Sequence, residues 1–306
     1  MTARVTLAPG HAGVARIQAL ARPRGALASR LGDSKRLIRH GDTTLGEAWA
    51  RAITIRMETP AEARGTATRA DSPDTLVQAL SLDESQTLRA PCPRDHAAQC
   101  WSPIGETFSA QPELVDQVTG DLAALDRKGL RVLRAACVIT CARRLNDGVA
   151  RGLTRFDIDL HAMERLALDA RARDRHDVVA ICGKVGSFDR YPAAFGPLSG
   201  RPCTVIEEGR ARSEYAIAGL GRLAFVRDAD DSHVLVSMAS LVGKWVRDTL
   251  MARVVRYHRA IDPTLPEASG YQDPVTARFI EGSRLARGAR ALPDDCFERR
   301  ALKGTR

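Results

Sequence analysis

The stretch VRDADDSHVLVSMASLVGKWVRDTLM, residues 226–251, decides the fold of this chain. An apolar strand pattern leads into it, and three carboxylates follow at once, Asp228, Asp230 and Asp231. A long helix pattern comes next. Carboxylates between a strand and a helix are suited to a divalent cation, because Mg²⁺ takes oxygen ligands. An Asp-rich loop before a helix is also typical of a solvated turn with a helix cap, so the cluster alone does not decide between the two.

The hydrophobic pattern of the remaining chain alternates between helices and strands. Helical spacing predicts helices over residues 45–55, 74–80, 112–128, 146–171, 237–259 and 274–287. Short apolar runs predict strands over residues 130–140, 177–182, 204–207, 215–220 and 223–226. Because strands and helices follow each other in this way, we expect an α/β fold with a mixed sheet covered by helices.

Composition places the chain among reduced, water-soluble proteins. Its 306 residues are 44% hydrophobic, which is enough for a substantial core. No run of 18 apolar residues indicates a membrane span, and no signal-peptide pattern opens the chain. Seven scattered cysteines indicate free intracellular thiols rather than a disulfide framework. We therefore expect a cytoplasmic protein without a membrane partner.

The net charge of +9 is concentrated at the two ends of the chain, over residues 1–70 and 276–306. Basic flanks around a nearly neutral middle favour a polyanionic partner such as nucleic acid. An arginine-biased coding sequence explains the same excess, since almost all of the basic residues are arginine. Both interpretations stay open at this point.

Three motifs, taken in order, resemble the ribonuclease HII family, the type 2 ribonucleases H. In that family an Asp lies ten residues before the Ser of an Ala-Ser-Ile-Leu-Ala-Lys-like helix start, and here these are Asp230 and Ser240. The family's Gly-Ser-Gly-Tyr-Pro-x-Asp-Pro loop is similar to residues 268–274, and its Asp-Ser-Lys-Lys segment is similar to residues 33–36. The resemblance is densest over residues 130–280.

The resemblance implies a ribonuclease H-like mixed sheet flanked by helices, with the first part of the sheet incomplete. The family begins with a strand carrying Asp-Glu-Ala-Gly-Arg-Gly, but no acidic residue precedes Asp33 here. We interpret residues 1–30 as an irregular or mis-called N-terminus. We interpret residues 31–306 as one ribonuclease H-like domain with an insertion around residues 57–111.

The family's chemistry is two-metal hydrolysis of the strand 5′ to a ribonucleotide, with Mg²⁺ or Mn²⁺. The resemblance implies a monomer that acts on RNA–DNA hybrids or on duplex DNA with embedded ribonucleotides. It assigns Asp230 as catalytic residue and metal ligand. We add Asp228 as a further metal candidate, since strand alternation places it on the side of Asp230. Asp189 is a possible substitute where the family's Asp falls on Gly183, but turn preferences favour an ordinary turn Asp at this position.

Few of the family's metal ligands are present, and this keeps alternatives open. One matched carboxylate is too few to hold two ions, so a catalytically inactive nucleic-acid-binding relative of the same fold is the second hypothesis. A damaged reading frame is a third.

Five residues are candidates for nucleic-acid contacts. They are Tyr271, Lys35, Lys184, Lys244 and Ser240. The resemblance places the tyrosine against a sugar, and aromatic rings commonly contact nucleic acid in this way. Three of the chain's five lysines fall in motif segments, where their compact charges suit phosphates. A solvated lysine or a tyrosine at the start of a helix explains the same residues.

Three further features lack a functional assignment. Cys92, His96 and Cys100 recur every four residues, but the spacing lacks a fourth zinc ligand, so we favour no metal there. Asn146 resembles a family residue, and helix capping explains it equally well. The charged, hairpin-like segment 207–213 is interpreted as a solvated loop.

Overall fold

The computed structural model describes residues 1–5, 25–38, 42–57, 70–90, 92, 102–174, 176–186, 188–270 and 273–300. Within these residues the fold is α/β, with a four-stranded mixed sheet flanked by helices, as the alternation of strands and helices predicts. No helix of the described part is long and apolar enough to cross a membrane.

The sheet places two strand ends side by side. Its strands are β3 (Val178–Gly183), β4 (Cys203–Glu208), β5 (Arg212–Ile217) and β6 (Gly221–Val226), in the order β3-β6-β5-β4. β4, β5 and β6 form an antiparallel meander, whereas β3 runs parallel to β6 with Gly183 opposite Val226. Because carboxyl ends of parallel strands meet at one edge of a sheet, the loops after β3 and β6 start together there.

One helix covers one face of this sheet. α9 (Arg155–Arg173) contributes Leu160 and Ala167 to a core that includes Tyr215 and Phe225. Tyr191, which precedes the short helix η4 (Pro192–Ala194), stacks on Phe225 with ring centroids 3.8 Å apart. This aromatic packing fixes the chain that follows β3 against the sheet.

A second, larger core lies among helices beside the sheet. Its elements are α3 (Thr44–Arg56), α4 (Pro73–Leu80), α7 (Pro112–Arg127), the two-stranded sheet of β1 (Thr2–Val5) and β2 (Leu130–Arg134), and the first half of α11 (Val234–Arg259). Trp49 and Trp245 are both buried there. Gly46 lets α3 approach α11, because a Cβ at this position would lie 2.5 Å from the Leu241 carbonyl oxygen.

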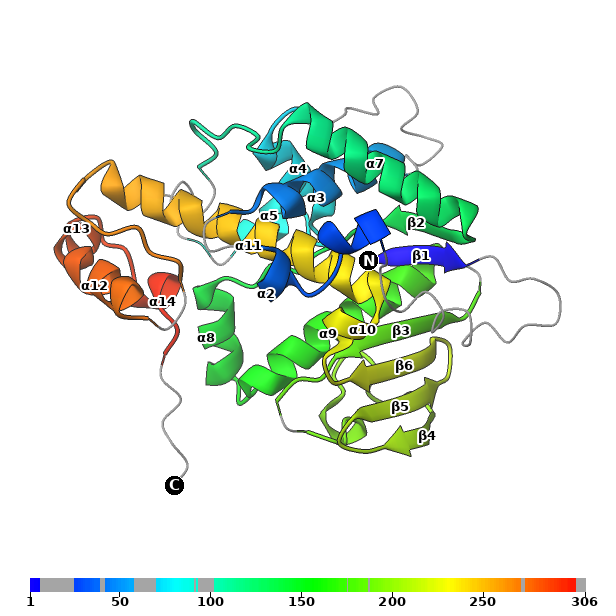
Figure 1. Cartoon of the computed structure of the whole chain (residues 1–306). Helices are drawn as coiled ribbons and strands as arrows, with labels where there is room; N and C mark the ends of the chain where they lie inside the picture. Colours follow the sequence, from blue (N-terminus) through cyan, green and yellow to red (C-terminus); the bar gives the residue numbers. More distant parts are fainter. Residues whose placement is uncertain are drawn as a thin grey trace.

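α11 connects the parts of the molecule. Figure 1 shows this helix crossing from the sheet, where α10 (Ala229–Ser232) precedes it, to the helices α12 (Pro274–Gly282), α13 (Arg284–Ala289) and α14 (Asp294–Phe297) at its other end. In its C-terminal half, buried Arg253 donates two hydrogen bonds to the carboxylate of Glu106, at 2.7 and 2.8 Å. The remaining short helices are η1 (Gly25–Ser29), α2 (Ser34–Leu37) and α5 (Ser85–Arg89).

Two predicted helices and two predicted strands differ from the structure. The strand predicted over 215–220 is β5 over 212–217, and residues 218–220 form the turn before β6. The helix predicted over 146–171 is two helices, α8 (Ala142–Ala150) and α9, because Gly152 adopts φ 91° and Thr154 caps α9. The helix predicted over 274–287 breaks at Ser283 into α12 and α13. The strand predicted over 130–140 ends with β2 at Arg134 and pairs with β1 outside the main sheet.

Candidate nucleic-acid interface

An open pocket of about 650 Å³ lies where β3 and β6 end. Its lining comes from four segments: the end of β3 and the loop after it, the β4–β5 turn, the β6–α10 connection, and the first turns of α11. Five residues singled out from the sequence line it together, Lys184, Asp189, Asp228, Asp230 and Ser240. Segments up to 57 residues apart therefore contribute to one surface, because the parallel pair brings their strand ends to the same edge.

The acidic side of the pocket is formed by the turn between β6 and α10. β6 ends at Val226, so strand alternation does not relate Asp228 to Asp230 as we predicted from the sequence. Instead, Asp228 adopts a left-handed conformation, with φ 50° and ψ 40°, and Asp230 lies in the first turn of α10. Asp tolerates this conformation better than most residues. Both side chains still line the pocket, and neither carboxylate has a bond to another described residue.

On the other side of the pocket, Lys184 connects several segments by hydrogen bonds. Its ammonium donates to Asp189 Oδ1 and the Gly209 carbonyl, both at 2.7 Å, to the Phe188 carbonyl at 3.1 Å, and to Ser213 Oγ at 3.3 Å. Its side chain is 8% exposed, against 45% for Asp189. This lysine is therefore engaged within the protein, where it ties the loop after β3 to the β4–β5 turn.

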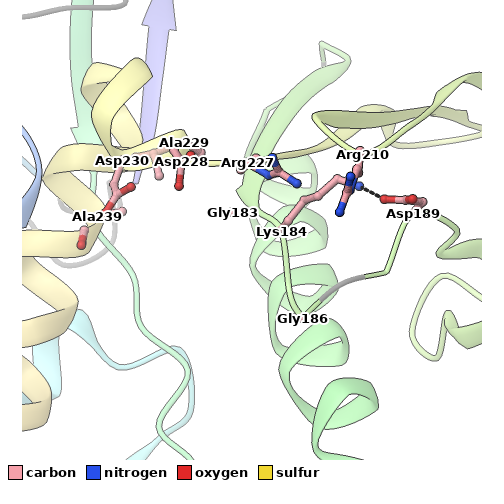
Figure 2. Close-up of a pocket in the computed structure, with 12 residues that line it drawn as sticks. Gly183, Lys184, Gly186, Asp189, Arg210, Arg227, Asp228, Ala229, Asp230 and Ala239 are labelled. Carbon is pink, nitrogen blue, oxygen red and sulfur yellow. Dashed lines mark hydrogen bonds and ion pairs between the residues drawn. The ribbon is translucent and has the colours of Figure 1, made fainter.

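Two arginines in the pocket have no such engagement. Arg210, in the β4–β5 turn, and Arg227, just after β6, are exposed and make no ion pair with another described residue. Figure 2 shows both side chains on the same side as Lys184, with Asp228 and Asp230 on the opposite side. Sequence reasoning missed them. The Arg227 amide donates to the Ala211 carbonyl at 2.9 Å, which brings the β4–β5 turn to the end of β6. Recognition of the hairpin in the sequence would therefore have indicated that the two arginines lie close together.

Two of the three sequence motifs meet beside the pocket. Ser240 Oγ on α11 lies 2.9 Å from Ser34 Oγ, which begins α2. Lys35 is the next residue of α2, and its side chain falls outside the described residues. Lys244 lies one turn after Ser240 on α11 and lines a separate groove of about 1140 Å³.

The third motif forms a loop held against α11. Arg247 donates to the Ser269 carbonyl at 2.8 Å, and Asp273 Oδ1 caps α12 by accepting from the Thr276 amide at 2.7 Å. Gly270 adopts φ 76° so close to Met251 that a Cβ would lie 2.7 Å from the sulfur. The glycine and the aspartate of this loop are therefore explained by backbone conformation and helix capping. Tyr271, for which we predicted a sugar contact, lies outside the described residues.

The described residues do not provide a ligand set for a pair of metal ions. Among them, no group of three or more His, Cys, Asp or Glu side chains is placed to hold a metal. Asp228 and Asp230 are two carboxylates, Asp189 pairs with Lys184, and Gly183 contributes no ligand. Two magnesium ions need more converging oxygens than this, so the described residues do not fit the two-metal centre that the resemblance implies.

Burial keeps two titratable groups near the pocket, a cysteine and a histidine, neutral at physiological pH. Burial raises the pKa of the Cys182 thiol, at the end of β3, to about 12, so the thiolate is absent. Burial and the nearby Arg212 lower the pKa of His233, which precedes α11, so its imidazole is uncharged. The charges available to a ligand are therefore those of the arginines and aspartates.

Two features left open by the sequence lie away from the pocket. Asn146 does not cap a helix but lies within α8, where it donates to the carbonyls of Asp295 and Glu298, both at 3.0 Å. It thereby anchors the C-terminal segment. Cys92 lies near Cys141 and Cys296, whereas His96 and Cys100 lie outside the described residues.

Comparison with known proteins finds no matching family model, no similar curated protein and no similar solved structure.

Proposed function

We propose that this chain is a nucleic-acid-binding protein with a ribonuclease H-like sheet, related to ribonuclease HII, and that it binds RNA–DNA hybrids or ribonucleotide-containing duplexes at the pocket where β3 and β6 end. The observation that carries this proposal is the meeting of motif residues from distant segments in one open pocket, together with two arginines that make no ion pair with another described residue. Arginine suits this task because its guanidinium binds phosphate oxygens in a bidentate way.

The basic charge of the chain supports the same proposal. With a net charge of +9 and a pI near 9.6, the protein attracts polyanions over a distance, and the two arginines provide contacts where the backbone arrives. Phosphate contacts position a nucleic acid without reading its sequence. We therefore expect binding that depends strongly on salt and weakly on sequence.

Salt-dependent binding of a labelled RNA–DNA hybrid tests the proposal. Fluorescence anisotropy should give a linear fall of log K with log salt, and the Arg210→Ser/Arg227→Ser variant should weaken binding and reduce the slope by about 1. Arg284→Ser is the matched control, because Arg284 is exposed on α13, far from the pocket. Equal loss in the control, or no binding at all, removes the proposal.

Hydrolysis is the second candidate function, because the same pocket holds two carboxylates that have no partner among the described residues, although two carboxylates are too few for a pair of metal ions. A cleavage assay on the hybrid with Mg²⁺ or Mn²⁺ compares the unmodified chain with Asp230→Asn. Cleavage above the level of the variant supports an endoribonuclease. Binding without such cleavage supports a non-catalytic relative.

A further inference from the structure

The charges of the pocket are divided between two walls. The guanidinium groups of Arg210 and Arg227 lie on the side of the β4–β5 turn, whereas the carboxylates of Asp228 and Asp230 lie on the side of α10 and α11 (Figure 2). None of these four groups has a hydrogen bond or ion pair with another described residue. A ligand therefore meets guanidinium groups on one wall and carboxylates on the other, and among the described residues none of them is engaged elsewhere.

This division limits which part of a nucleic acid enters the pocket. A strand carries one phosphate for each nucleotide, about 3.4 Å apart along the helix axis. If one phosphate binds the two arginines, the next phosphate of a continuous strand comes toward the two aspartates. Like charges brought together in this way repel each other, by about 1 kcal/mol for two unit charges 4 Å apart in water. An internal nucleotide is therefore disfavoured when no cation neutralises the carboxylates.

A strand end avoids this repulsion. The last nucleotide has a phosphate on its 5′ side but only hydroxyl groups on its 3′ side. Hydroxyl groups donate hydrogen bonds, and ionised carboxylates accept them. The pocket volume of about 650 Å³ lies within the range of sites that enclose small ligands.

We propose that the pocket binds the 3′-terminal nucleotide of a nucleic-acid strand, with its 5′-phosphate on Arg210 and Arg227 and its free sugar hydroxyls on Asp228 and Asp230. This inference rests on the proposed function, since it names the part of the nucleic acid that enters the pocket. The recognised chemistry is a nucleoside 5′-phosphate with a free 3′-hydroxyl. A free mononucleotide carries the same groups as a strand end.

Three single-stranded oligonucleotides of one sequence separate end binding from backbone binding. One ends in a 3′-hydroxyl, one ends in a 3′-phosphate, and one is circular and has no end. Anisotropy is measured in EDTA, so that no divalent ion bridges phosphate to carboxylate. We expect the 3′-hydroxyl strand to bind about tenfold more tightly than the other two.

Charge-neutral variants test the role assigned to each wall. Asp228→Asn/Asp230→Asn should strengthen binding of the 3′-phosphate and circular strands, so that the tenfold ratio falls toward one. Asn tolerates the left-handed conformation of residue 228, so the turn is retained. Asp116→Asn, an exposed change on α7, should keep the full ratio. Arg210→Ala should weaken binding of the 3′-hydroxyl strand most.

The outcomes distinguish this inference from the proposed function. If the circular and 3′-hydroxyl strands bind the unmodified chain equally well, the end-binding inference is wrong while nucleic-acid binding stands. If none of the strands and no hybrid binds, the proposed function itself fails.

Competition with adenosine 5′-monophosphate shows whether the ligand is a strand end or a free nucleotide. Displacement at concentrations similar to the 3′-hydroxyl strand supports a free nucleotide, and displacement only at much higher concentrations supports a strand end.

Discussion

Replacing Lys184 by Met should lower the free energy of unfolding, with only a small effect on the affinity for nucleic acid. The substitution keeps most of the aliphatic chain but removes the ammonium that is 2.7 Å from both Asp189 Oδ1 and the Gly209 carbonyl oxygen. Hydrogen bonds that involve a charged group contribute about 1.5–3 kcal/mol each. Asp189 is 45% exposed, so water replaces part of this loss. We therefore expect the free energy of unfolding to fall by about 2–3 kcal/mol.

Urea denaturation followed by circular dichroism measures this change, with anisotropy on the RNA–DNA hybrid measured in parallel. Lys128→Met is the matched control, because Lys128 is exposed at the end of α7 and should change stability by less than about 0.5 kcal/mol. A Lys184→Met protein that is as stable as the control, but binds the hybrid far more weakly, would contradict the structural role assigned to Lys184. Lys184 would then be a phosphate contact rather than a tie between two loops.

Three further predictions concern a histidine and two glycines. Burial, together with Arg287 and Arg290, lowers the pKa of His258 from 6.5 to about 4. The unfolded chain therefore binds this proton more readily, and the free energy of unfolding should fall by about 3 kcal/mol as the pH drops from 6.5 to about 4. His258→Phe should remove this pH dependence in urea titrations. Gly270→Ala should cost about 1–2 kcal/mol in the same assay, because φ is 76° and the new Cβ would lie 2.7 Å from Met251 Sδ. Gly183→Asp should create Mn²⁺ binding measurable by calorimetry, since a Cβ at Gly183 meets nothing within 4 Å and a third carboxylate then joins the pocket.

Each of these predictions has a control and a contradicting result. If the free energy of unfolding of His258→Phe falls with pH as much as that of the unmodified chain, groups other than His258 cause the pH dependence. Gly243→Ala on α11 has open space around it and should be neutral or stabilising, so equal losses at Gly243 and Gly270 would contradict the strain argument. Gly120→Asp on α7 should bind no Mn²⁺, and calorimetry that shows no difference from Gly183→Asp would contradict the placement of the third carboxylate.

The fold class and several elements could be predicted from sequence because they depend on local patterns. Helical spacing around Trp49 predicts α3, and the spacing over 112–128 predicts α7, since each helix buries one apolar stripe. The break between α8 and α9 was missed because apolar spacing continues across it. Gly152 and the cap at Thr154 interrupt the backbone there without interrupting the hydrophobic pattern.

The candidate site was predictable only in part. Asp228 and Asp230 follow a strand directly, so their place at a sheet edge can be read from the sequence. Arg210 looked like part of a solvated loop, because its nearness to these residues depends on the pairing of β5 with β6. The partnership of Lys184 with Gly209 is likewise long-range, since it requires the turn to fold back over the end of β3. Local sequence patterns indicate which segments form helices or strands, whereas the pairing of strands determines which charged side chains lie close together.

Hydrogen–deuterium exchange of the whole chain, with and without a saturating RNA–DNA hybrid, tests the location of binding most directly. We expect slower exchange in peptides that cover residues 183–190, 208–212 and 226–241, with little change in α7 or α13. Protection confined to peptides outside these three segments would contradict the assignment of this pocket as the nucleic-acid interface.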